Sequence, residues 1–133
     1  MANQYGNLGN LAKTRGDLAA AEGYYAQALT LNQELGRKEG MANQYGNLGV
    51  LAATRGDLAA AEGYYEQSLT LNQELGRKEG MANQYGNLGG LEHERGNMAG
   101  ARTFWGQARD LYAEIGMPHM VEKLQGWIDS LDG

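Results

Sequence analysis

The sequence repeats itself with a period of 40 residues. Residues 1–40 and 41–80 differ at only four positions, which leaves 36 of the 40 residues identical. A third copy opens with the same MANQYGNLG at 81–89 and then drifts, while the spacing of its apolar residues is kept. Such a period indicates an array of small units that stack on one another, because one unit cannot bury its apolar face alone.

Each unit contains two helical patterns joined by a tight turn. The first covers about residues 2–15, with apolar residues every three or four positions. Gly16 allows a left-handed backbone at its end, and Asp17 can cap the second helix, which covers about residues 18–35. Gly36 ends the second helix, and the short segment 37–40 then leads into the next unit. The pattern predicts an all-α fold, an α-solenoid of antiparallel helix pairs.

The repeated residues resemble the tetratricopeptide repeat family, in the longer variety of kinesin-light-chain-like arrays. The aromatic–Leu-Gly signature falls on Tyr5-x-x-Leu8-Gly9, Tyr45-x-x-Leu48-Gly49 and Tyr85-x-x-Leu88-Gly89, and later motif positions fall on Gly16, Ala21, Tyr25 and Ala28 with their copies. Two features depart from the family: the large residue after the Leu-Gly pair is Ala12, Ala52 or Glu92, and the closing proline is missing. The resemblance implies a right-handed superhelix of three repeats, 1–40, 41–80 and 81–116.

Residues 117–133 break the motif and are expected to form a C-terminal capping helix. Pro118 suits the first turn of a helix. Leu124 and Ile128 belong to an apolar stripe at three-to-four spacing, with charged residues elsewhere. At this spacing Trp127 is expected to pack in the core, although it could also anchor a partner.

Composition and charge exclude several classes of function. The chain has no cysteine, a net charge of −5 and a pI of about 5.0, so a disulfide, a thiolate-bound metal and a nucleic-acid partner are not expected. No apolar run approaches the roughly 20 residues of a membrane span, and the N-terminus lacks the pattern of a signal peptide. We therefore expect a cytoplasmic chain without a membrane partner.

Catalytic and metal-binding constellations are not expected either. His93 and His119 are the two histidines, and neither has a second histidine four residues away. Glu92, His93 and Glu94 are consecutive on a helix, so their side chains point in different directions and cannot converge on an ion. The sequence predicts no metal, no cofactor and no enzyme.

In the resembled family the first helices line a concave surface that receives protein segments or extended peptides. The resemblance places these residues in that groove: Asn3, Gly6, Asn7, Asn10 and Lys13 in the first unit, Asn43, Gly46, Asn47 and Val50 in the second, and Asn83, Gly86, Asn87 and His93 in the third. Asparagine amides match both polar groups of a peptide unit. The alternative is that these asparagines only solvate a helix face or bond between repeats.

The charge of the expected groove limits which kinds of peptide could bind there. Lys13 is its basic residue, and the same position becomes Ala53 and then His93. The lysine and arginine clamp for a C-terminal carboxylate that some family members use is therefore largely missing. A neutral groove favours an extended, uncharged peptide.

A second interpretation is a structural or engineered array that associates with itself. The chain begins at Met1 in phase with Met41 and Met81, without the residues that introduce later units. It could be a fragment of a longer repeat protein, or an engineered or recently duplicated array. Near-identical units favour homo-oligomers or domain swaps through an uncapped N-terminal end.

Glycine is unusually frequent in this sequence, with 21 residues where average usage gives about 9. Gly6 and its two copies lie in the middle of a helix, at a cost of about 1 kcal/mol each relative to alanine. Beside the asparagines they would let a partner backbone approach closely. Gly23 and Gly63, inside the second helices, have no explanation in the pattern.

Overall fold

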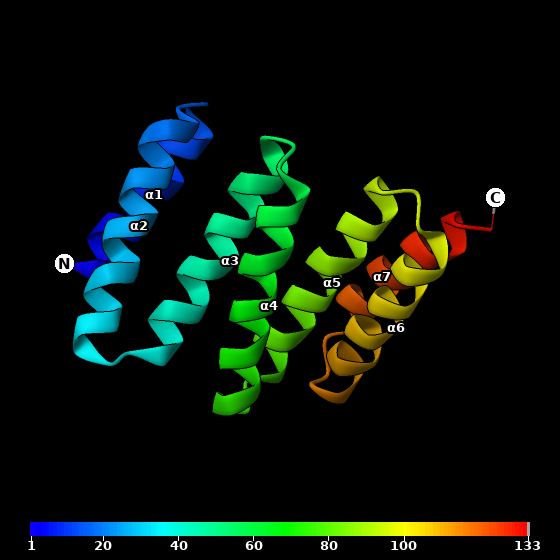
Figure 1. Cartoon of the computed structure of the whole chain (residues 1–133). Helices are drawn as coiled ribbons and strands as arrows, with labels where there is room; N and C mark the ends of the chain where they lie inside the picture. Colours follow the sequence, from blue (N-terminus) through cyan, green and yellow to red (C-terminus); the bar gives the residue numbers. More distant parts are fainter. Residues whose placement is uncertain (133) are drawn as a thin grey trace. The chain divides into compact units, whose positions relative to one another are not determined.

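The computed structural model describes residues 1–132 and is helical throughout, with no strand in that range. The helices over these residues are α1 (Ala2–Thr14), α2 (Leu18–Leu35), α3 (Lys38–Thr54), α4 (Leu58–Leu75), α5 (Lys78–Glu94), α6 (Met98–Glu114) and α7 (Pro118–Ser130) (Figure 1). The chain divides into two compact units, residues 1–71 and the part from Asn72 onward, and each is described by itself. The predicted helix pairs are confirmed.

The turn within each pair has the predicted chemistry. The left-handed backbone of Gly16 (φ 81°) separates α1 from α2. The Asp17 carboxylate then accepts a hydrogen bond from the Ala20 amide at 3.0 Å and so caps α2. The same bond recurs in the later repeats, at 3.1 Å from Ala60 to Asp57 and at 3.0 Å from Gly100 to Asn97.

The link between repeats is shorter than the sequence pattern suggests. Residues 38–40, predicted as part of a connecting segment, form the first turn of α3, and residues 78–80 do the same for α5. The left-handed Gly36 (φ 67°) ends α2, and Arg37 is the N-cap of α3, so only these two residues separate the helices. The first helices of the second and third repeats therefore have 17 residues each.

In the first unit the core lies where α1, α2 and α3 meet. Ala21 and Tyr25 of α2 form a buried cluster with Leu48 and Leu51 of α3. Gly9 is required there, because a Cβ at this position would lie 2.5 Å from Cε1 of the Tyr25 ring. The glycine of the Leu-Gly pair is thus the contact point between the two helices of a repeat, as the resemblance implies.

A second close contact explains Gly40, in the first turn of α3. The Asn32 side chain, 4% exposed, donates to the Ala28 carbonyl at 2.9 Å and lies against Gly40. A Cβ on Gly40 would lie 2.7 Å from Asn32 Nδ2. The glycine lets the buried amide sit between the end of one repeat and the start of the next.

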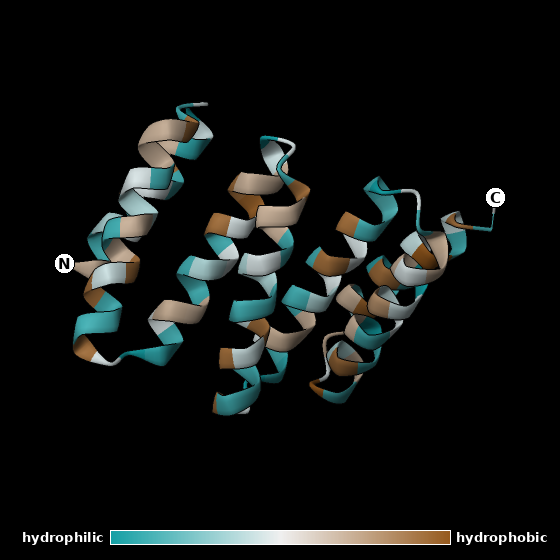
Figure 2. Ribbon diagram, in the orientation of Figure 1, coloured by the Kyte–Doolittle hydropathy of each residue, from teal (hydrophilic) through white to brown (hydrophobic). Residues whose placement is uncertain are grey.

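In the second unit α5, α6 and α7 share one core. Trp105 and Tyr112 of α6 are buried together with Leu124 and Ile128 of α7. The Trp105 indole donates to the Gly86 carbonyl at 3.1 Å. The predicted C-terminal helix therefore packs on the last helix pair with the predicted stripe. Figure 2 shows apolar and polar stretches alternating along α3, which is in plain view.

Candidate functional site

The residues predicted for a groove share one face of each first helix, of α1 and α3 in the first unit and of α5 in the second, and we call these faces together the Asn face. Its members are Asn3, Gly6, Asn7, Asn10 and Lys13 on α1, Asn43, Gly46, Asn47 and Val50 on α3, and Asn83, Gly86, Asn87 and His93 on α5. Members three or four residues apart share a helix face. In the first unit α1 contacts α3, and the Gly6 position of α1 lies against Gln44 of α3.

The first asparagine of each row is exposed. Asn3, Asn43 and Asn83 all have exposed side chains, and so has Asn7. An amide in this position presents a carbonyl acceptor and two N–H donors to whatever lies against the helix.

The second asparagine is partly engaged within its own helix in the later repeats. Asn47 and Asn87 are half-buried, and each donates from Nδ2 to the glutamine three residues earlier, Gln44 or Gln84, at 3.3 Å. The bond leaves the amide oxygen and one N–H of each asparagine for a partner. These glutamines are buried and were not predicted as part of the site, although their spacing from the asparagines is one at which helical side chains meet.

Two tyrosines of the second helices reach the Asn face and hold asparagines by their oxygens. The Tyr25 hydroxyl donates to Asn10 Oδ1 at 2.6 Å, and the Tyr112 hydroxyl donates to Asn83 Oδ1. Burial raises the pKa of both tyrosines, and the Glu79 carboxylate raises that of Tyr112 further. Both hydroxyls therefore keep their protons at neutral pH, and the two asparagine NH₂ groups remain as donors.

The glycines of the Asn face have unequal surroundings. Gly6 is buried, and a Cβ there would lie 3.2 Å from Nε2 of Gln44. The space at Gly6 is therefore taken by a side chain of the second repeat instead of lying open to a partner backbone. At Gly86, by contrast, no heavy atom of the described chain lies within 4 Å of the Cβ position. Gly46 is buried on α3.

The remaining positions vary from one repeat to the next. Lys13 is exposed at the end of α1, and Val50 is half-buried on α3. His93 is exposed on α5, and its ring centroid lies 5.7 Å from that of Trp105. The polar groups that recur on the Asn face are therefore side-chain amides, and Lys13 adds a positive charge at the end of α1.

Comparison with known proteins assigns the family. The model of the tetratricopeptide repeat matches residues 1–74, more than half of the 133-residue chain. The chain belongs to the tetratricopeptide repeat family. A search of curated proteins finds no match.

Two solved structures share the tetratricopeptide-repeat fold. BtubC (BKLC) from P. vanneervenii has 21% identity and a TM-score of 0.74, over 98% of this chain and 63% of its own. The N-terminal domain of stress-induced protein-1 (STI-1) from C. elegans has 16% identity and a TM-score of 0.70, over 93% of this chain and 94% of its own. The chain thus spans less than two thirds of the BtubC chain. At these identities the likeness shows the fold, an all-α tetratricopeptide-repeat solenoid.

The last helix keeps the phase of the repeat. Pro118, the first residue of α7, follows Lys78 and Lys38, the first residues of α5 and α3, by 40 and 80 positions. By this phase Trp127 occupies the place of Asn87, and Lys123 that of Asn83. Helix α7 therefore begins in phase with α3 and α5 and carries different side chains at the positions that hold asparagine in those helices.

Trp127 is only partly in the core. Its side chain is 38% exposed, its ring lies 5.4 Å from that of Trp105, and the Lys123 ammonium lies 5.3 Å from the ring centroid. It was predicted mainly as a core residue of the cap. The 40-residue period could have indicated this exposed position, because it aligns Trp127 with Asn87 of the Asn face.

Two further features, a cluster of metal-ligating side chains and a membrane-crossing helix, are both absent among residues 1–132. No group of three or more His, Asp or Glu side chains in this range is placed to hold a metal ion. Within the same range, none of the helices has the length and hydropathy that a membrane crossing requires.

Proposed function

We propose that this chain is a peptide-binding scaffold whose Asn face holds the main chain of an extended, uncharged segment of a partner protein. Tetratricopeptide repeats are modules of protein–protein interaction, and solenoids offer extended surfaces for it. The proposal includes no catalytic step. It specifies which atoms of the surface bind and what they recognise.

The observation that carries the proposal is the anchoring of Asn10 and Asn83 by tyrosine hydroxyls. Each amide oxygen is occupied by the Tyr25 or Tyr112 hydroxyl, so the side chain is oriented before a partner arrives. Both asparagines are nevertheless exposed. Oriented donors bind a peptide carbonyl with less loss of side-chain entropy than free ones.

The exposed asparagines supply the complementary groups. Asn3 and Asn43, on adjacent helices of the first unit, present an acceptor and donors each. A main chain lying against them can therefore satisfy both its N–H and its C=O groups. Recognition of this kind depends little on the side chains of the peptide.

The test uses Asn3 and Asn43 of the first unit, whose side chains are exposed. A displayed peptide library is selected on the immobilised chain, and the affinity of a selected peptide is measured by calorimetry. Replacing Asn3 and Asn43 by alanine removes two amide contacts and should weaken binding by about tenfold or more. Gln33→Ala, an exposed amide lost from the end of α2, should leave the affinity unchanged.

The mode of recognition has its own readout. A peptide with N-methylated backbone amides loses main-chain donors but keeps its side chains, so it should bind weakly. Unchanged affinity for the Asn3→Ala/Asn43→Ala variant, or for the methylated peptide, would reject the proposal.

A second candidate function is self-association, favoured by the exposure of two leucines. Leu8 and Leu11 of α1 are 41% and 46% exposed, whereas Leu48 and Leu51, the same residues of the second repeat, are 5% and 2% exposed. The latter pair is covered by Ala21 and Tyr25 of α2. The exposed leucines of α1 are thus the same residues that α3 uses to pack against the helix before it, α2.

The energy available to such an association is small. Covering the exposed parts of Leu8 and Leu11 contributes about 2 kcal/mol. Self-association of the 133-residue chain is therefore expected only at high concentration. Light scattering should give a mass that rises with concentration for the unaltered chain and stays at 14.4 kDa for Leu8→Gln/Leu11→Gln. A concentration-independent mass of 14.4 kDa for the unaltered chain would exclude this function.

A further inference from the structure

The second repeat carries an open hollow on a face that the Asn face does not share. It has a volume of about 700 Å³ and lies along α3 and α4 in the first unit. The lining residues are Met41, Tyr45, Ala60, Gly63, Tyr64, Glu66, Gln67, Thr70 and Leu71, and we call it the outer hollow. Successive helical residues are about 100° apart, so Asn43 and Asn47 lie roughly 160° around α3 from Tyr45.

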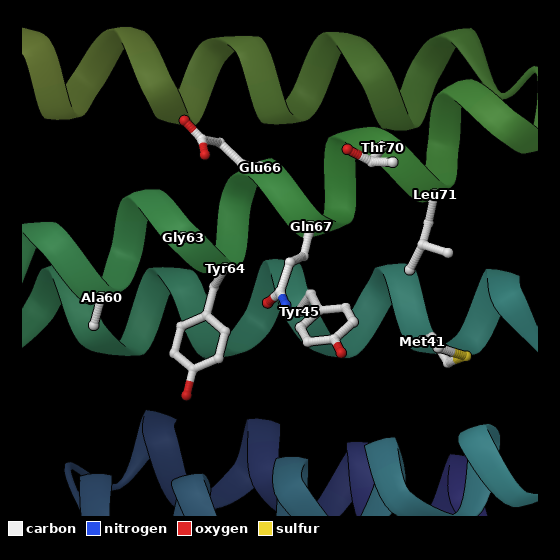
Figure 3. A pocket seen from close by; sticks show the side chains of 9 residues that line it. All are labelled: Met41, Tyr45, Ala60, Gly63, Tyr64, Glu66, Gln67, Thr70 and Leu71. Atoms are coloured by element: carbon white, nitrogen blue, oxygen red, sulfur yellow. The ribbon is translucent and has the colours of Figure 1, made fainter.

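The floor of the outer hollow is apolar and aromatic. The rings of Tyr45 and Tyr64 lie 6.3 Å apart at an angle of 31°. Figure 3 shows these rings and Met41 on the same side of the two helices, with Gly63 and Ala60 along α4 beside them. Pairs of aromatic rings with a polar tip are frequent anchors at protein interfaces.

Gly63 has no role that contacts within the chain explain. It is exposed in the middle of α4, and apart from the adjoining residues and backbone of α4 no atom of the described residues comes within 4 Å of its Cβ position. An alanine there would fit and would favour the helix. The missing side chain leaves space in which the backbone of another molecule can come close to α4.

The chemistry of the lining favours a helix as the occupant. Gln67 and Thr70 are the uncharged polar side chains that line the outer hollow, apart from the two tyrosine hydroxyls. An extended peptide would bury many N–H and C=O groups here without partners, which is costly. An α-helix satisfies its own backbone and can cross another helix at 8–10 Å where small residues such as Ala60 and Gly63 meet it.

The charge around the hollow selects a basic partner. A smaller hollow of about 130 Å³ adjoins it and shares Ala60 and Tyr64. Among its lining residues Arg55 is paired with Glu22, while Asp57 caps α4. With Glu66 on the rim of the outer hollow, the unbalanced charge of this surface is negative, and the whole chain carries −5.

We propose that the outer hollow binds a basic amphipathic α-helix of a partner protein. The apolar side of the helix lies over Tyr45, Tyr64 and Gly63, and its lysine or arginine side chains extend to Glu66. This site goes beyond the peptide binding proposed for the Asn face and uses other residues, so either proposal can fail alone.

The probe is a synthetic peptide of about 15 residues, leucine on one helical side and lysine on the other. Its affinity is measured by fluorescence anisotropy with the full chain. Gly63→Leu places a side chain in the hollow at a position where a Cβ has open space, and it should weaken binding by about tenfold or more while the helix content is kept. Gly126→Leu is the control, because Gly126 also lies inside a helix, α7, is exposed and has the same open surroundings among the described residues.

Charge is tested separately. Glu66→Ala, which restores the residue of the first repeat, should weaken binding about two- to fivefold at low salt and less at high salt. A matched peptide with glutamate in place of lysine should bind at least about tenfold more weakly. Thr70→Arg, which places a cation in the hollow at an exposed position, should weaken binding of the lysine peptide even if Gly63→Leu fails to fold.

The proposal is overturned by any of four results. These are no binding of the lysine peptide at millimolar concentration, unchanged affinity for Gly63→Leu and Thr70→Arg, an equal loss for Gly126→Leu, or equal affinity for the glutamate peptide. Unchanged binding of the lysine peptide to Asn3→Ala/Asn43→Ala is expected, and a loss there equal to that of Gly63→Leu would contradict a separate site.

Discussion

The same chemical change, glycine to alanine, is predicted to have opposite effects at two positions of the second repeat. At Gly49 the new Cβ would lie 2.5 Å from Cε1 and 2.6 Å from Cδ1 of the Tyr65 ring. Tyr65 is buried, with 3% of its surface exposed. At Gly63 the new Cβ would meet no atom of the described chain within 4 Å.

The magnitudes follow from two opposing terms. Alanine favours a helix interior over glycine by about 1 kcal/mol, and this gain applies to both sites. Overpacking a core costs about 1–3 kcal/mol, and the upper end applies at Gly49 because 2.5 Å is far inside ordinary contact with a buried ring. Gly49→Ala should therefore lower the free energy of unfolding by about 2 kcal/mol, while Gly63→Ala raises it by about 1 kcal/mol.

Thermal and urea unfolding followed by far-UV circular dichroism measures both variants. For a chain of this size the shifts correspond to a Tm about 8 °C lower for Gly49→Ala and about 4 °C higher for Gly63→Ala. Gly9→Ala, which meets Tyr25 in the same way, should behave like Gly49→Ala. Equal shifts at Gly49 and Gly63 would refute the claim that the Leu-Gly glycine is fixed by ring packing.

Two further predictions concern buried polar contacts. Tyr112→Phe removes the hydroxyl bond to Asn83 and should cost about 1 kcal/mol at pH 7. Burial and Glu79 raise the pKa of Tyr112 in the folded chain. The stability that the hydroxyl contributes is therefore fully present below a pH of about 10 and is lost as the pH rises further, so the unfolding free energies of variant and parent should converge there. A difference that stays constant with pH would contradict this. Gly40→Ala should lower the free energy of unfolding by about 1–3 kcal/mol, because the new Cβ meets the buried Asn32 side chain. Adding Asn32→Ala should recover part of that loss, and a double-mutant cycle of unfolding free energies measures the recovery.

The fold was predictable from the sequence because one local pattern recurs in phase. Gly16 and Asp17 mark a turn by their own chemistry, and the observed α1 and α2 end within about one residue of the expected bounds. Residues 37–40 were predicted as a connecting segment. The first unit of the sequence starts at Met1, the counterpart of Met41, and so shows no counterpart of residues 38–40 from which a longer first helix could be inferred. In the structure the segment from Lys38 already belongs to α3.

The candidate site was predictable in its residue types and less so in its environment. The bond of Asn47 to Gln44 follows from a spacing of three on a helix, which the sequence contains. The filling of the space at Gly6 by Gln44 depends on how two repeats pack, which no local pattern contains. The outer hollow depends in the same way on the packing of Tyr45 against Tyr64.

The central claim is that the Asn face binds a peptide through its amides, and side-chain NMR tests it most directly. The asparagine NH₂ resonances of the labelled chain are followed while a library-selected peptide is added. The account predicts that Asn3, Asn43, Asn10 and Asn83 shift on titration while the NH₂ group of the exposed Gln33 on α2 does not. Saturable binding that leaves the asparagine resonances in place would contradict it.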